Sequence, residues 1–69
     1  MNIEKIANEE TLFKMNLIIK QYSHRTLIDE EILEEKIKAY YFKNYEKIPN
    51  ESLSLVNSIK ELGVYCSKY

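Results

Sequence analysis

The sequence predicts an all-α fold: a small antiparallel three-helix bundle with helices near residues 9–22, 28–47 and 51–62. In three segments apolar residues recur at spacings of three and four, which is the period of an amphipathic helix. One glycine and one proline in 69 residues are too few turn residues for a β-rich fold. A chain of this length forms one domain, residues 1–69, with a small core that dimerisation or partner binding would complete.

The first helical region spans residues 2–22. Asn2 is a candidate cap for a short turn, and Asn8, followed by two glutamates, is a candidate cap for a helix. The residues leave open whether this region is one helix or a turn followed by a helix. Its main apolar face is predicted to contain Leu12, Met15, Ile18, Ile19 and Tyr22. Residues 23–25 are predicted to connect it to the second helix.

The central segment from Thr26 to Tyr45 contains no glycine or proline and gives the longest helical signal. Thr26 and Asp29 match a capping box, with Asp29 itself a second candidate cap. Carboxylates precede lysines along this segment, which complements the dipole of a helix. Its main apolar arc is predicted to contain Leu33, Ile37, Tyr40, Tyr41 and Ile48.

Pro49 is expected to end the second helix, and Asn50 to cap the third. The apolar stripe of the third helix is predicted to contain Leu55, Ile59 and Leu62. Gly63 is predicted to stop it in a left-handed conformation, with Val64 packing back on Ile59. The residues after Gly63 are too few for a prediction.

Two helices carry more apolar surface than a three-helix bundle needs. In the second helix Ile28, Ile32 and Phe42 lie on the side opposite the main arc, and in the first Phe13 and Leu17 lie on a second side. If these five residues are exposed together, they form a patch that binds a larger protein or a second copy of the chain. The alternative is that the helix phases differ, or that the terminal segments cover these residues.

No group of residues matches a catalytic or metal site. His24 is the single histidine, and no neighbour in sequence would position it as a general base. Cys66 has no second cysteine and is interpreted as a free thiol of the C-terminal tail, which oxidation would pair between chains if it is exposed. The carboxylates of residues 29–35 complement the helix dipole and lack the histidines of di-metal bundles. We therefore expect no enzyme activity, no metal and no cofactor.

Net charge and hydropathy exclude other classes of protein. The formal net charge is −1, so no whole-chain basic field attracts nucleic acid. Lysines do alternate with tyrosines between Lys36 and Lys47, but residues 51–62 contain no arginine and would make a poor recognition helix. A DNA-binding regulator is therefore only a further alternative. No apolar run is long enough to span a membrane, and one cysteine fits a reducing cytoplasm.

Several residues of the second half of the chain resemble the later helices of enterocin A-type bacteriocin immunity proteins. They are Ile32, Tyr40, Tyr41, Phe42, Tyr45, Lys47, Ile48 and residues 58–63. The resemblance implies a helical bundle that protects a producing cell from its own pore-forming peptide. The chain departs from that family's four-helix pattern, because the first helix would be missing. We expect first a small non-catalytic regulator or inhibitor, of the phage- or plasmid-borne kind, and an immunity-like bundle as the alternative.

Overall fold

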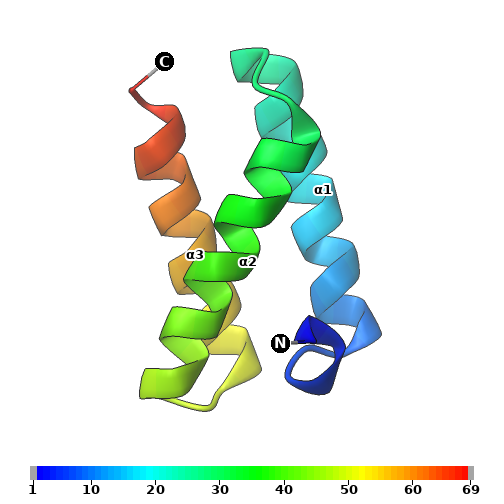
Figure 1. Ribbon diagram of the computed structural model, residues 1–69, viewed down its shortest axis with the longest axis vertical. Coiled ribbons are helices and arrows are strands. Elements are labelled where there is room, and N and C mark those ends of the chain that lie inside the picture. The colour runs from blue at the N-terminus through cyan, green and yellow to red at the C-terminus, as the bar shows by residue number, and fades with distance from the viewer. Residues whose placement is uncertain (1, 69) are drawn as a thin grey trace.

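Three helices of similar length lie side by side, and helices that follow one another in the chain run antiparallel (Figure 1). The computed structural model describes residues 2–68. A 3₁₀ turn η1 (Ile3–Lys5) is followed by the helices α1 (Glu9–Thr26), α2 (Glu30–Lys47) and α3 (Glu51–Cys66). Each pair of helices is in contact, and α2 packs most extensively on α3. The predicted three-helix bundle is confirmed.

A side-chain oxygen caps the start of every helix. Asn8 Oδ1 accepts from the Thr11 N–H at 2.9 Å, and Asn50 Oδ1 accepts from the Leu53 N–H at 2.9 Å. Before α2, Asp29 accepts from the Glu31 N–H at 2.9 Å. These contacts satisfy backbone donors that have no partner within the helix. Asn2 caps η1 separately, so the first region is a turn followed by a helix.

The connection between α1 and α2 lies later in the chain than predicted. Ser23, His24 and Arg25 form the last turn of α1, and Thr26 is its final residue. The Thr26 hydroxyl donates to the Tyr22 carbonyl at 2.6 Å within α1, so Thr26 does not cap α2. Asp29 is the cap instead. The prediction missed this because Leu27, which ends α1 in the left-handed region at φ 63°, is neither glycine nor asparagine.

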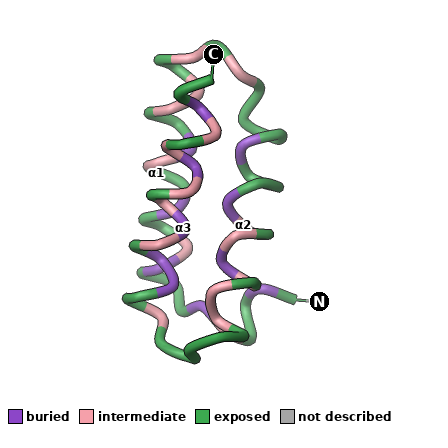
Figure 2. Tube along the Cα trace, turned by 90° about the vertical axis from the view of Figure 1, so that its left-hand side faces the viewer, coloured by how far each residue is buried: buried purple, intermediate pink, exposed green. Residues whose placement is uncertain are grey.

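The core runs along the inward sides of the three helices (Figure 2). Its fully buried apolar side chains are Leu33, Ile37, Tyr41 and Leu62. Met15 and Ile19 of α1, Leu55 and Cys66 of α3, and Ile3 and Ala7 of the N-terminal segment complete it. The predicted apolar faces are confirmed at most of these positions. Ile48 is an exception at 53% exposed, because α2 ends at Lys47 and Ile48 is extended.

The N-terminal segment is tied to the bundle by two long-range hydrogen bonds. The Tyr41 hydroxyl of α2 donates to the Ile6 carbonyl at 2.6 Å. The Asn8 N–H donates to a Glu51 carboxylate oxygen at 2.7 Å, which joins the start of α1 to the start of α3. Tyr41 is also stacked on Tyr45, with 5.9 Å between the ring centroids. The turn before α1 is therefore part of the folded core.

The predicted stop of α3 at Gly63 is wrong. Gly63 has no positive φ and lies inside α3, which continues to Cys66. A Cβ at Gly63 would lie 3.2 Å from Tyr22 Oη, so its lack of a side chain allows α1 and α3 to approach closely. Val64 does not pack back on the helix but is 63% exposed. Cys66 was predicted to be a free thiol in the C-terminal tail. It is free, but it lies in the last turn of α3 and is buried in the core.

Candidate interaction surfaces

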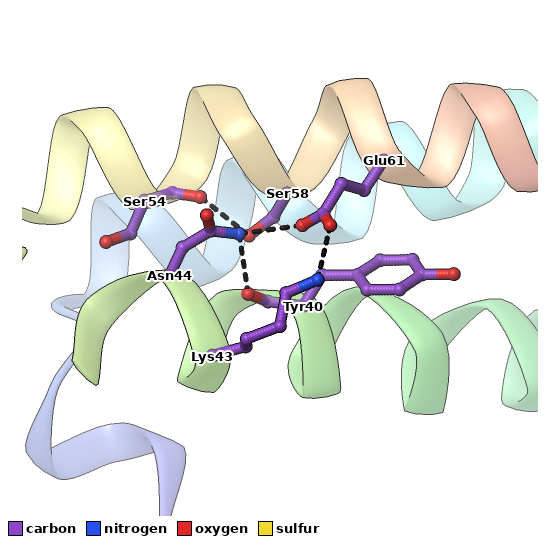
Figure 3. Close-up of polar contacts among 6 residues, drawn as sticks. All are labelled: Tyr40, Lys43, Asn44, Ser54, Ser58 and Glu61. Atoms are coloured by element: carbon purple, nitrogen blue, oxygen red, sulfur yellow. Dashed lines mark hydrogen bonds and ion pairs between the residues drawn. The ribbon is translucent and has the colours of Figure 1, made fainter. Parts of the chain in front are cut away.

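A polar network joins α2 to α3 on the surface of the bundle (Figure 3). Glu61 of α3 accepts hydrogen bonds from Lys43 Nζ at 2.5 Å and from Asn44 Nδ2 at 2.8 Å. Asn44 Nδ2 also donates to the Tyr40 carbonyl one turn earlier, at 2.8 Å. These contacts fix the register between the two helices.

Neighbouring side chains stabilise the ionised carboxylate of Glu61. The hydrogen bond from Lys43 keeps the pKa of the Glu61 carboxyl below its ordinary value, against the opposing effect of partial burial. The hydrogen bond from Asn44 and the charge of Lys47 lower this pKa further. Glu61 therefore stays ionised and neutralises one lysine of this surface.

The two buried serines of α3 have structural partners. Ser58 Oγ donates to the Ser54 carbonyl at 2.6 Å, and Ser54 Oγ lies 3.5 Å from the Ile48 carbonyl (Figure 3 shows the two serines). Among the described residues, no buried side-chain oxygen or nitrogen lacks a hydrogen-bond partner. Both hydroxyls therefore donate to backbone carbonyls of the same chain segment.

A shallow groove lies between α2 and α3, beside this network. It encloses about 310 Å³ and is lined by Tyr40, Lys60, Glu61, Val64, Tyr65 and Lys68, which we call the α2–α3 groove. Two further lysines lie above its aromatic rings. Lys36 Nζ is 5.0 Å from the Tyr65 ring centroid, and Lys43 Nζ is 5.6 Å from that of Tyr40. The groove thus combines an apolar floor with a cationic rim.

The five residues predicted to bind a partner differ in exposure. Phe13 is 62% exposed, Leu17 46% and Ile32 45%. Ile28 and Phe42 are half-buried and pack against the core, so they offer less surface than predicted. Ile28 lies in the loop before α2, where its carbonyl accepts from the Ser23 hydroxyl at 2.6 Å.

The structure brings Phe13 and Leu17 together and separates them from Ile32. Phe13 and Leu17 are one turn apart on the side of α1 opposite the buried Met15 and Ile19, and we call this pair the α1 outer face. Ile32 is one turn before Lys36, which reaches Tyr65, so Ile32 lies toward the α3 side of α2.

Sequence reasoning missed other exposed apolar residues. They are Leu27 at 90%, Leu53 at 41%, Val56 at 47% and Val64 at 63%. The α3 members are spaced by three and eight residues, so a second helical stripe on α3 was detectable. Leu27 and Val64 gave no such signal, because both were assigned to segments outside the helices.

Cys66 and His24 have side chains of the types that act as nucleophiles or bases in enzymes. Burial raises the pKa of the Cys66 thiol, and the charge of Arg25 opposes this effect. His24 is exposed in the last turn of α1. Within residues 2–68, no three histidine, cysteine, aspartate or glutamate side chains are grouped so as to hold a metal ion. None of the helices described is both long and apolar enough to cross a bilayer.

Comparison of the chain with protein-family models, with curated proteins and with solved structures found no match. The resemblance to bacteriocin immunity proteins therefore depends on the quoted residues alone.

Proposed function

We propose that this protein is a non-catalytic binding module, a small regulator or inhibitor that masks part of a larger protein through the α1 outer face. The observation that carries the proposal is the exposure of Phe13 and Leu17, on consecutive turns of one helix. An apolar pair at this spacing is the anchor used when a helix docks in the groove of a partner.

The core explains why these residues are available for binding. Leu33, Ile37 and Leu62 are fully buried, and Phe13 and Leu17 are not among the apolar side chains that pack against the core. Burying either exposed side chain in a partner would contribute up to about 1.5–3 kcal/mol. Because folding does not use this surface, association is the event that would bury it.

The burial and the raised pKa of the Cys66 thiol support the proposal that the protein is not an enzyme. An activated cysteine has a lowered pKa and some exposure, whereas Cys66 is buried and its pKa is raised. A free thiol also suits a reducing compartment, which supports a cytoplasmic location as part of this proposal.

The test is to make Phe13→Glu and Leu17→Glu separately, with Ala39→Glu as the matched control. Ala39 is exposed on α2, so the control adds the same charge at an exposed apolar position on another helix. All three variants should keep their helicity and their free energy of unfolding within about 0.5 kcal/mol, because none removes a core contact.

The readout is affinity capture from cells of the source organism, compared by quantitative mass spectrometry and followed by titration of the captured protein. We expect a protein that the unmodified chain and Ala39→Glu retain, and that Phe13→Glu and Leu17→Glu bind at least about tenfold more weakly. If the partner is a second copy of the chain, light scattering should give the mass of a dimer for the unmodified protein and of a monomer for Phe13→Glu and Leu17→Glu. Equal capture and equal mass for all proteins would refute the α1 outer face as the binding surface.

A further inference from the structure

Lysines gather around the α2–α3 groove although the whole chain has a net charge of −1. Lys60 and Lys68 line the groove, and Lys36 and Lys43 lie over its tyrosine rings. Lys47 is close enough for its charge to lower the pKa of Glu61. Among the described residues that line the groove, Glu61 is the single one with a side-chain carboxylate, and it already accepts from Lys43 and Asn44. The groove therefore has a local positive potential that favours an anionic ligand.

The floor of the groove is apolar. Val64, which is 63% exposed, lines the groove together with the half-buried rings of Tyr40 and Tyr65. The volume of about 310 Å³ is at the lower limit of small-ligand pockets, which suits one large side chain better than a whole cofactor. The ligand that matches both features has an apolar group flanked by negative charges.

We propose that the α2–α3 groove binds an acidic segment of a partner protein. One apolar or aromatic side chain of that segment packs on Val64, Tyr40 and Tyr65, and the carboxylates of the segment pair with the surrounding lysines. This is a second surface, separate from the α1 outer face, because its lining comes from α2 and α3.

A protein segment fits this groove better than a nucleic acid. Single-stranded nucleic acids stack their bases on open aromatic faces. Here Lys36 and Lys43 lie over the faces of Tyr65 and Tyr40. The first turns of α2 also carry carboxylates from Glu30 to Glu35, which would repel a long polyanion that extended beyond the groove. A short acidic segment needs only the groove itself.

The probe is a synthetic peptide of about five residues, made of glutamate and aspartate with one central phenylalanine. Control peptides replace the phenylalanine by serine or the acids by lysines, and a thymidine oligonucleotide of equal length represents single-stranded nucleic acid. Titrations are followed by fluorescence anisotropy and by amide chemical shifts of the isotope-labelled protein. We expect saturable binding of the first peptide, shifts centred on Lys60 to Lys68, and weakening as salt rises.

Two pairs of variants separate charge from the apolar floor. Lys60→Glu should weaken binding about tenfold, whereas the same reversal at the exposed Lys20 of α1 should not. Val64→Ser should weaken binding about threefold to tenfold, whereas Val56→Ser, outside the groove on the same helix, should not. These exposed positions make no core contact, so loss of the fold would not confuse the result.

Three results would overturn the inference. They are the absence of saturable peptide binding, equal binding by Lys60→Glu and Lys20→Glu, and tighter binding of the oligonucleotide than of the acidic peptide. None of them concerns Phe13 or Leu17, so failure here leaves the α1 outer face to its own test.

Discussion

Leu27 is in a conformation and an environment that are both unfavourable for leucine. Its φ of 63° places it in the left-handed region, and its side chain is 90% exposed. An L-residue pays roughly 1–2 kcal/mol there, because its Cβ approaches the following carbonyl. Its N–H nevertheless donates to the Ser23 carbonyl at 2.8 Å and ends α1. The backbone requires this conformation at the turn, and the leucine side chain contributes little to the fold.

Replacing Leu27 by glycine should therefore stabilise the protein. Glycine adopts positive φ without strain, and after subtraction of its greater freedom in the unfolded chain we expect a gain of about 0.5–1 kcal/mol. Urea unfolding followed by circular dichroism measures it. Ala39→Gly, at an exposed position inside α2, is the opposite control and should cost about 1 kcal/mol. A lower midpoint for Leu27→Gly would show that the exposed side chain makes a stabilising contact.

At the scale of the elements, the sequence predicted where helices begin far better than where they end. The starts were predicted from the N-cap residues Asn8, Asp29 and Asn50. A short polar side chain that can accept from a free backbone N–H is a signal that depends only on local sequence. The end of α2 at Lys47 was predicted from Pro49, but the ends of α1 and α3 were not. Leu27 ends α1 without being a typical cap residue, and the end of α3 depends on tertiary packing. Gly63 looked like a stop, but in the fold its missing side chain makes room for Tyr22, which is distant in sequence.

The same limit applies to the candidate sites. The exposure of Phe13 and Leu17 follows from the helical period and was predictable. The α2–α3 groove was not, because it depends on the register that Asn44 and Glu61 set between two helices. It also includes Val64, which the sequence placed outside α3. The spacing of apolar residues predicts which residues share one side of a helix, but it does not predict which other helix packs against that side.

A prediction about α3 follows from the close approach at Gly63. Alanine favours a helix interior by about 1 kcal/mol over glycine, but its Cβ would crowd the Tyr22 hydroxyl at 3.2 Å. Gly63→Ala should therefore be more favourable, by about 0.5–1 kcal/mol, in a protein that carries Tyr22→Phe, which lacks that hydroxyl. A double-mutant cycle by urea unfolding measures the difference. Additive effects would show that the Tyr22 ring moves aside without cost.

At the scale of the whole molecule, Tyr41 connects parts of the chain that no single helix joins. Its ring is fully buried, and its hydroxyl holds the N-terminal segment through the Ile6 carbonyl. Burial, with the charges of Glu51 and Tyr45 adding to it, raises the pKa of Tyr41 from 10.0 to about 12. Glu51 in turn accepts from the start of α1. The ionisation of this one phenol is therefore linked to the packing of the N-terminal segment, α1, α2 and α3.

The sign of this linkage gives a prediction for alkaline unfolding. Between pH 10 and 12 the unfolded chain loses the Tyr41 proton while the folded protein keeps it, so stability falls as pH rises. The stability that depends on keeping Tyr41 protonated is fully present below pH 10 and is lost as the pH rises through the folded-state pKa of about 12. Tyr41→Phe should lower stability at neutral pH by about 1–2 kcal/mol, because the Ile6 carbonyl loses its donor.

The decisive measurement is the free energy of unfolding at a series of pH values from neutral to alkaline. Tyr41→Phe should decline less steeply above pH 10 than the unmodified protein, because the residue that binds its proton more tightly in the folded state is gone. Parallel curves for Tyr41→Phe and the unmodified protein would mean that Tyr41 ionises as easily in the bundle as in the unfolded chain. The N-terminal segment would then have to be held by its other contacts, of which the Glu51 hydrogen bond to Asn8 is the strongest candidate.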